Sequence, residues 1–223
     1  SSVYGDHLFL PKKQENTGNV LSPYAATKAM DEIYAGVFTK CYNMECIGLR
    51  YFNVFGPRQD PKGAYAAVIP KFIDIMRNNK QPTINGDGTF SRDFTYVSDV
   101  VNAIISASIS EVSGDIINIG SDNTYSVNRL VELLGGNVVY IPKRPGEPEC
   151  TWADISKAKK LLDWRPEISL EKGVIRLLEN IIFVNSFSFI FSPRQLTAAY
   201  NLQIVDKEIA KKRLNIIQKK LFK

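Results

Sequence analysis

The stretch SPYAATK, from Ser22 to Lys28, reads as the start of a helix. Ser22 is a typical N-cap residue and Pro23 suits the first helical position, so the sequence predicts a helix over about 23–39. Apolar residues follow with helical spacing at positions 26, 30, 33, 34 and 37. Tyr24 and Lys28 then lie one turn apart on one face of the helix. About one Tyr-x-x-x-Lys pair is expected by chance in this composition, so the surrounding sequence decides what the pair means.

Outward from this helix, strand and helix patterns alternate. Strand patterns occupy CIGLRYFNV (46–54), PTINGDG with its turn (82–88), DIINIG (115–120) and NVVYIP (137–142). Helix patterns occupy 64–79, 96–108, 126–135, 155–164 and 169–181, and residues 1–4 have the pattern of a strand end. This alternation predicts an α/β fold with parallel strands. No G-x-G-x-x-G or G-x-x-G-x-x-G pattern occurs in the 223 residues, so that type of dinucleotide-phosphate turn is absent from the sequence.

Composition indicates an ordinary globular protein, with 44% apolar and 23% charged residues. No apolar run is long enough to span a bilayer, and the N-terminus lacks the features of a signal peptide. The three cysteines lack zinc-type spacing to one another or to His7, so we expect no metal site and a reduced, cytoplasmic protein. The net charge of +5 comes from residues 192–223, which hold eight basic and two acidic residues. We therefore expect no nucleic-acid partner for the main body.

A phenol is a poor base at neutral pH, but an ammonium group beside it favours the phenolate. The pair Tyr24 and Lys28 could therefore take the proton of an alcohol while a nicotinamide cofactor removes hydride. The alternative is a helix pair with no chemical role. The motifs around the pair favour the first interpretation.

Five motifs occur in a fixed order: SSVYGD, SPYAATK, LRYFNVFGPRQ, SRDFTYVSDV and RPGEPECTWADISKAKKLLDW. In this order they resemble the extended short-chain dehydrogenase/reductase family, in particular its NAD-dependent nucleotide-sugar epimerase/dehydratase branch. The resemblance covers about residues 1–180, from the middle of the family's domain to its end, and is closest to UDP-N-acetylglucosamine 4-epimerases. It implies the C-terminal half of a Rossmann-like parallel sheet plus a small α/β substrate-binding domain. It also implies a homodimer where the full domain is present.

The resemblance divides the chain into three parts. Residues 1–64 would be the remainder of the NAD-binding domain. Residues 65–180 would mainly bind the nucleotide sugar, with part returning to the Rossmann sheet. Residues 181–223 match nothing in the family and form a divergent basic tail with an amphipathic pattern at about 205–221.

The resemblance also implies the catalytic and cofactor residues. Tyr24 would be the acid/base at the sugar 4-hydroxyl, and Lys28 would favour its phenolate and bind the nicotinamide ribose. The family's hydroxyl partner falls one position before Ser1, so Ser1 and Ser2 are included as its neighbours. The remaining cofactor candidates are Tyr51, Phe52 and Arg58, although Tyr51 also reads as a core aromatic.

The implied substrate residues follow the strand and helix ends. Asn53 would bind the diphosphate, Arg92 and Arg144 would clamp it, and guanidinium groups suit phosphate oxygens. The nucleotide would also meet Ala67, Val68, Lys71, Thr83, Ile84, Asn85 and Glu147, while Thr151 would leave room for a 2-acetamido group. Asp93, Asp99, Trp152 and Trp164 read as structural residues, and Gly86 to Gly88 as a turn.

Ser2 distinguishes between the reactions of this branch. Dehydratases and decarboxylases usually carry an acid at this position, and a serine cannot replace that carboxylate. The sequence therefore favours NAD-dependent 4-epimerisation of a UDP-hexose, with UDP-GlcNAc/UDP-GalNAc as the preferred pair and UDP-Glc/UDP-Gal as the second. The alternatives are a nucleotide-sugar dehydratase or decarboxylase, or an inactive remnant that binds only the nucleotide sugar.

Overall fold

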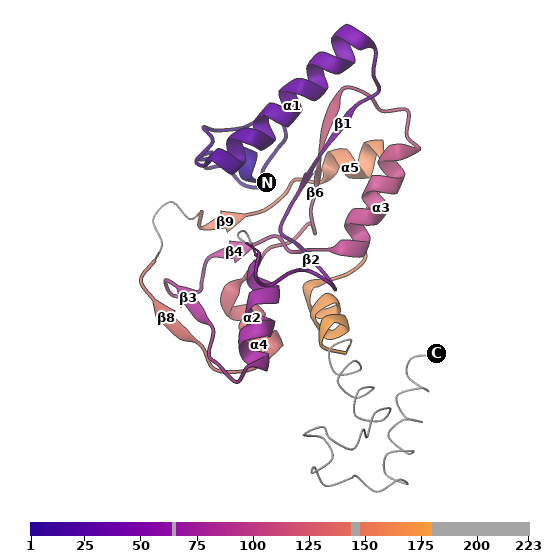
Figure 1. Ribbon diagram of the computed structural model, residues 1–223. Coiled ribbons are helices and arrows are strands. Elements are labelled where there is room, and N and C mark those ends of the chain that lie inside the picture. The colour runs from indigo at the N-terminus through magenta and orange to yellow at the C-terminus, as the bar shows by residue number, and fades with distance from the viewer. Residues whose placement is uncertain (64–65, 144–147, 180–223) are drawn as a thin grey trace, which may run out of the picture. The chain divides into compact units, whose positions relative to one another are not determined.

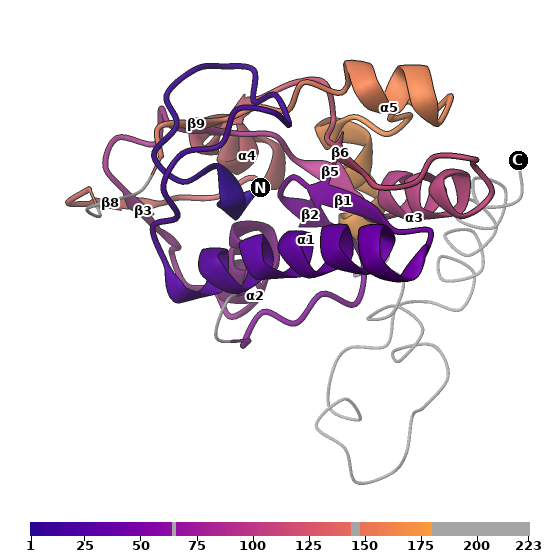
Figure 2. The same ribbon diagram turned by 90° about the horizontal axis from the view of Figure 1, so that it is seen from above.

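Strands β1 (Ile47–Tyr51) and β6 (Asp115–Ile119) pair in parallel at the centre of the fold. The computed structural model describes residues 1–63, 66–143 and 148–179, and residues 1–178 form one unit. Helix α1 (Pro23–Tyr42) lies on one side of the β1–β6 pair, and α5 (Ser156–Leu161) lies on the other (Figures 1 and 2). Helix α3 (Val97–Ser108) also packs against β1. The predicted α/β class with parallel strands is therefore confirmed.

Helix α1 begins where the sequence predicts. Ser22 Oγ accepts a hydrogen bond from the N–H of Ala25 at 3.1 Å, and Pro23 occupies the first turn. The helix continues to Tyr42, three residues beyond the prediction, and ends at Asn43 in the left-handed conformation.

A second group of elements lies below the β1–β6 pair in Figure 1. Its members are α2 (Val68–Arg77), β3 (Thr83–Asn85), α4 (Val127–Leu134) and β8 (Val139–Ile141). Strands β3 and β8 pair in parallel. Helix α2 starts four residues later than predicted, because Pro70 lacks an N–H and fits only the first turn.

Short strands connect the two groups. Strand β4 (Ser91–Arg92) pairs in parallel with β9 (Cys150–Thr151) and antiparallel with β7 (Tyr125–Ser126). Strand β2 (Val54–Phe55) pairs in parallel with β5 (Thr95–Tyr96). The β4–β9 pair matters for the site because it places Arg92 directly opposite Thr151.

The N-terminal prediction is wrong in its element type. Residues Ser2–Tyr4 form a 3₁₀ turn, η1, instead of a strand end. The N–H groups of Tyr4 and Gly5 donate to the carbonyls of Ser1 and Ser2, and Gly5 takes a positive φ. A glycine at this position permits the chain to turn immediately towards the loop before α1.

Three apolar clusters form the core. One surrounds β1 and β6 and includes Phe52 and Trp164. A second joins Phe55 and Phe94 to α2, α4 and the helical residues 170–179, and a third lies between α2, β3 and α4. The packing role predicted for Trp164 is confirmed. Tyr51 is 37% exposed, so its interpretation as a core aromatic is wrong.

Candidate functional site

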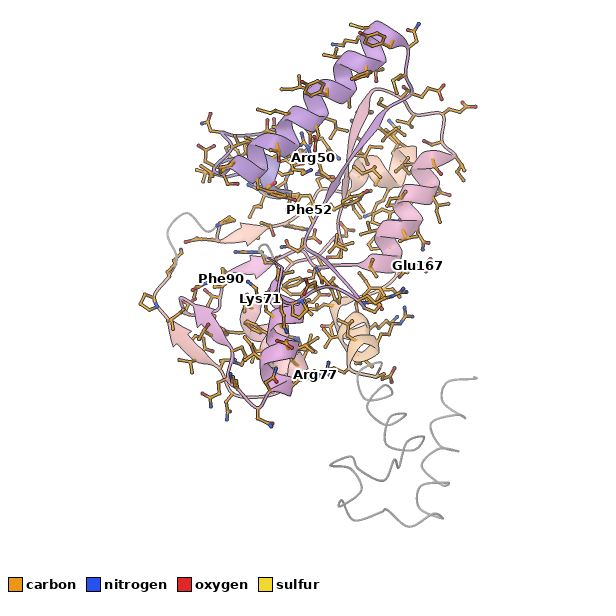
Figure 3. The ribbon with its side chains drawn as sticks, viewed as in Figure 1. Arg50, Phe52, Lys71, Arg77, Phe90 and Glu167 are labelled. Atoms are coloured by element: carbon orange, nitrogen blue, oxygen red, sulfur yellow. The ribbon has the colours of Figure 1, made fainter. Side chains whose placement is uncertain are left out.

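A cavity of about 400 Å³ lies among α2, β3 and β4. Eight of the predicted substrate residues line it: Asn53, Ala67, Val68, Lys71, Thr83, Ile84, Asn85 and Arg92. These residues come from four separate segments of the chain between residues 53 and 92, and the fold brings them together around one cavity. Figure 3 shows Lys71 on α2 and Phe90 close to the start of β4, two positions that border the cavity.

The cavity is positively charged. Lys71 and Arg92 are its charged lining residues, and no carboxylate lines it among the described residues. The Arg92 guanidinium lies 4.9 Å from the centre of the Phe90 ring, and its Nη1 donates to the Ser91 carbonyl at 2.8 Å. These contacts fix the direction of the guanidinium, as an anion-binding group requires.

Thr151 lies beside the cavity lining. Its Oγ1 donates to Asn53 Oδ1 at 3.1 Å, and Thr151 faces Arg92 across the β4–β9 pair. Asn53 has a positive φ of 23°, which is uncommon for a residue other than glycine. The structure therefore brings together three of the residues predicted to meet the substrate: Asn53, Arg92 and Thr151.

Tyr24 and Lys28 lie in the first turns of α1. The Lys28 ammonium is 5.9 Å from the centre of the Tyr24 ring, and the Tyr24 side chain is 46% exposed. Lys28 Nζ also lies 2.8 Å from Asp31 Oδ2. The hydrogen bond and negative charge of Asp31 raise the pKa of Lys28, which keeps the ammonium charged.

The segment with Ser1 and Ser2 packs against α1. The terminal amino group of Ser1 donates to the carbonyl of Tyr51 at 2.9 Å, so this segment meets the end of β1. The remaining cofactor candidates differ in access: Phe52 is fully buried, whereas Tyr51 and Arg58 are exposed. Arg58 does not line the cavity. Arg144 and Glu147 lie outside the described residues, as does the tail 181–223.

The Tyr24–Lys28 pair could hold the ribose of a nicotinamide cofactor. Both side chains reach the surface, and Tyr24 supplies a hydroxyl group while Lys28 supplies an ammonium group for such a contact. Phe52 does not suit direct contact with the ring, because no part of it is exposed. The described residues contain no group of three metal-ligating side chains and no helix able to cross a membrane.

The sequence did not identify several residues of the site. Phe90, which lies against Arg92, directly precedes the two-residue strand β4, and a strand this short has no periodicity that could have revealed it. Phe94 lines the cavity two positions after Arg92, whereas Val127 and Ile141 line it from distant segments. No local pattern predicts such long-range contacts.

Comparisons with known proteins agree with this geometry. The family model described as "NAD dependent epimerase/dehydratase family" matches residues 1–120. A putative UDP-glucose 4-epimerase of Methanocaldococcus jannaschii is 40% identical over 183 residues, which are 79% of this chain and 59% of that protein.

Solved structures give the same result. The UDP-N-acetylglucosamine 4-epimerase of Methanobrevibacter ruminantium, in complex with UDP-N-acetylmuramic acid, is 37% identical with a TM-score of 0.77. The match covers 82% of this chain and 61% of that one. The UDP-glucuronic acid 4-epimerase of Bacillus cereus, in complex with UDP-glucuronic acid and NAD, is 35% identical with a TM-score of 0.72 over 82% and 60% of the two chains.

This chain thus spans about 60% of the length of these relatives. Within that span, the matched residues include SPYAATK and the strands that border the cavity. The chain belongs to the NAD-dependent epimerase/dehydratase family.

Proposed function

We propose that the protein takes part in the NAD-dependent 4-epimerisation of a UDP-hexose, with UDP-N-acetylglucosamine and UDP-N-acetylgalactosamine as the preferred pair. The observation that carries this proposal is the cavity lined by Lys71 and Arg92 without a carboxylate among its described lining residues. Two cations in a partly enclosed space favour a ligand with two negative charges, which a sugar-linked diphosphate provides.

The rest of the cavity suits a nucleotide. Thr83 and Asn85 offer polar groups on β3, while Phe90, Phe72 and Ile75 provide apolar surface. Small-molecule sites commonly combine a mostly apolar wall with a few polar groups that set orientation. This composition supports a pyrimidine base at the β3 end and a diphosphate between Lys71 and Arg92.

The sugar end would lie towards Asn53 and Thr151. Thr151 donates a hydrogen bond to Asn53, and the Thr151 side chain is small. A small side chain at this position supports space for a 2-acetamido substituent, which a larger residue would occupy. The M. ruminantium relative, whose name specifies UDP-N-acetylglucosamine, is consistent with this choice.

The proposed chemistry uses Tyr24 as the acid/base at the 4-hydroxyl of the sugar. Lys28 would stabilise the phenolate and bind the nicotinamide ribose, and Asp31 keeps Lys28 charged. NAD, when bound, accepts hydride from C4 and returns it, so the overall reaction involves no net oxidation. Returning the hydride to the other face of the 4-keto sugar inverts C4.

Ser2 supports epimerisation over dehydration or decarboxylation. Its hydroxyl occupies the sequence position at which eliminating enzymes of the branch carry an acid, and a hydroxyl cannot act as a carboxylate base at neutral pH. The reaction therefore stops at reduction of the 4-keto sugar.

Conversion of UDP-N-acetylglucosamine to UDP-N-acetylgalactosamine in the presence of NAD tests the proposal. Tyr24→Phe should reduce turnover at least roughly 100-fold while leaving UDP-sugar affinity unchanged. Unchanged turnover in Tyr24→Phe would refute Tyr24 as the acid/base.

Calorimetric titration separates epimerase from a protein that only binds the sugar nucleotide. Binding of both NAD and UDP-N-acetylglucosamine supports the epimerase, whereas binding of the UDP-sugar without NAD supports the inactive alternative. Arg92→Ala should weaken UDP-sugar binding, and Arg129→Ala is the matched control because Arg129 forms an exposed ion pair with Glu132. Equal affinity in the two variants would contradict the diphosphate site.

A further inference from the structure

Asp93 lies between two residues that line the cavity, Arg92 and Phe94, but its own side chain is fully buried. Its Oδ1 accepts hydrogen bonds from the N–H of Ser121 at 2.6 Å and from Thr95 Oγ1 at 3.4 Å. Its Oδ2 accepts from the N–H of Ala153 at 3.1 Å. One carboxylate thus joins three segments that are far apart in the sequence.

Two of these segments lead to residues of the proposed site. Ala153 lies two positions after Thr151, which pairs with Arg92 across the β4–β9 ladder. Thr95 is linked directly to Asn53, because the N–H of Thr95 donates a hydrogen bond to the carbonyl of Asn53 at 3.3 Å. The carboxylate is therefore one hydrogen bond from the segments that set the positions of Thr151 and Asn53.

The space around the carboxylate is filled. A Cβ added to Gly120 would lie 2.6 Å from Asp93 Oδ2 and 2.5 Å from the Cβ of Ala153. Gly120 directly follows β6 and immediately precedes Ser121, so the chain after β6 closes over the carboxylate without space for a side chain. Such close packing means that a change at Asp93 must move a neighbouring segment.

We propose that Asp93 is a positioning residue for the nucleotide-sugar site, because it holds the strand ends that carry Asn53, Arg92 and Thr151 in one arrangement. This inference rests on the proposed function. Asp93 does not contact the substrate, and it acts through the residues that its carboxylate ties together.

The charge of the carboxylate matters for this role. An ionised carboxylate accepts hydrogen bonds at both oxygens, whereas a protonated one must place a hydrogen at one of them. The N–H groups of Ser121 and Ala153 need both acceptors. Burial raises the pKa of Asp93 to about 6, so the carboxylate loses its second acceptor within an accessible pH range.

Charged side chains on the surrounding segments have other partners. These contacts are Arg92 to the Ser91 carbonyl, Lys12 to the His7 carbonyl, Lys159 to Asp122, and the Ser156 N–H to Asp154. We therefore expect protonation of Asp93 to affect the site through the hydrogen bonds of its own carboxylate, and not through an ion pair with one of these side chains.

The test measures the affinity for UDP-N-acetylglucosamine by calorimetry between pH 5 and pH 8. This ligand has no phosphate group that titrates near pH 6, and His7→Gln removes the one histidine of the chain. We expect affinity to fall roughly ten-fold from pH 8 to pH 5. Asp93→Asn should bind roughly ten-fold more weakly at pH 8, because the amide leaves one backbone N–H without an acceptor, and its affinity should not vary with pH.

Asp99→Asn is the matched control. Asp99 is also buried, and its carboxylate accepts two backbone N–H groups, but these belong to Glu167 and Ile168, in a segment that carries no residue of the proposed site. We expect the control to keep the affinity and pH dependence of the unchanged chain. Equal loss of affinity in both variants would overturn the inference, because it would indicate a general effect of buried carboxylates.

The outcomes separate the inference from the proposed function. If the unchanged chain does not bind the UDP-sugar at any pH, the proposed function fails and the inference fails with it. If it binds and Asp93→Asn binds equally well, only the inference fails. If Asp93→Asn does not fold, the amide resonances of Ser121 and Ala153 in the unchanged chain decide: they should titrate together near pH 6, and constant resonances would overturn the inference.

Discussion

Two buried aspartates show how single residues hold distant segments of this chain together. Asp99 Oδ2 accepts hydrogen bonds from the N–H groups of Glu167 and Ile168, and Trp164 Nε1 donates to the Asp99 carbonyl. The structural role predicted for Asp99 is therefore confirmed, although the carboxylate binds a distant segment and not its own helix turn. Asp93 has the same chemistry at the border of the cavity.

Asp93 also predicts how stability depends on pH. Burial raises its pKa from 3.8 to about 6, so the folded protein binds this proton more tightly than the unfolded chain. Its contribution to stability is full below pH 3.8 and declines as the pH rises towards 6. From pH 4.5 to pH 8, the advantage of the unchanged chain over Asp93→Asn should fall by about 2 kcal/mol.

Urea unfolding of the two proteins at several pH values measures this difference. The comparison cancels other carboxylates, such as Asp154 and Glu171, whose lowered pKa values act in the opposite direction. A difference that stays constant or grows with pH would contradict the prediction. A decline of this difference as the pH rises would mean that burying the ionised carboxylate of Asp93 lowers the free energy of unfolding.

Thr151 should decide which sugars fit. Thr151→Tyr places a large ring beside Asn53, so it should weaken UDP-N-acetylglucosamine binding at least roughly ten-fold more than UDP-glucose binding. Calorimetry with both ligands measures the ratio, and Thr151→Ser is the control because it keeps the hydroxyl. The same loss for both ligands would place the acetamido group elsewhere.

Among the elements, α1 is joined to β1 by a largely buried ion pair. Its residue Ala25 is fully buried, whereas large apolar residues such as Ile33 and Tyr34 are exposed. The Arg50 guanidinium on β1 binds Glu32 with two hydrogen bonds, at 2.8 and 2.9 Å. Figure 3 shows Arg50 between α1 and β1. Because this pair is largely buried, it should contribute more than a surface pair.

Removing one partner of this pair tests its contribution. Glu32→Ala leaves the buried Arg50 charge without its carboxylate, so the free energy of unfolding should fall by about 2–3 kcal/mol. Glu132→Ala removes the exposed partner of Arg129 and should cost less than about 0.5 kcal/mol. Denaturant unfolding measures both values, and equal losses would show that α1 is held by other contacts.

The longer elements could be predicted from the sequence, whereas the short strands could not. Helices α1 and α3 and strands β1 and β6 follow clear periodicity or capping patterns. Two-residue strands such as β4 and β9 have no periodicity, and they form because Ser91 and Cys150 meet across the fold. The 3₁₀ turn at Ser2–Tyr4 likewise depends on where the loop after Gly5 leads.

The residues of the candidate site also divide into those that the sequence predicts and those that it does not. Residues within motifs, such as Asn53 and Arg92, could be predicted, and the fold places them around one cavity. Residues whose role depends on a distant partner, such as Arg50, could not, because no local pattern reveals Glu32 as its partner. Phe52 shows a further limit: its position in a motif does not reveal that it is fully buried.

For the whole molecule, charge is distributed unevenly. Residues 1–191 hold 20 basic and 21 acidic residues, so the +5 net charge of the chain comes from 192–223. The cations of the cavity are therefore a local feature of a nearly neutral body. Deleting 192–223 should abolish binding to a cation exchanger at pH 7 and leave the affinity for UDP-N-acetylglucosamine unchanged. A loss of UDP-sugar affinity would show that the deleted residues contribute to the site.

Strand β1 has one further consequence, for the behaviour of the protein at high concentration. Among the described residues, β1 pairs only with β6, and the Ser1 amino group meets the other edge at Tyr51. An open strand edge presents N–H and C=O groups that can pair with another chain. Helix α1, which packs against β1, exposes Met30, Ile33 and Val37. This edge of β1 is therefore a place at which a further strand, from this protein or from another chain, could pair.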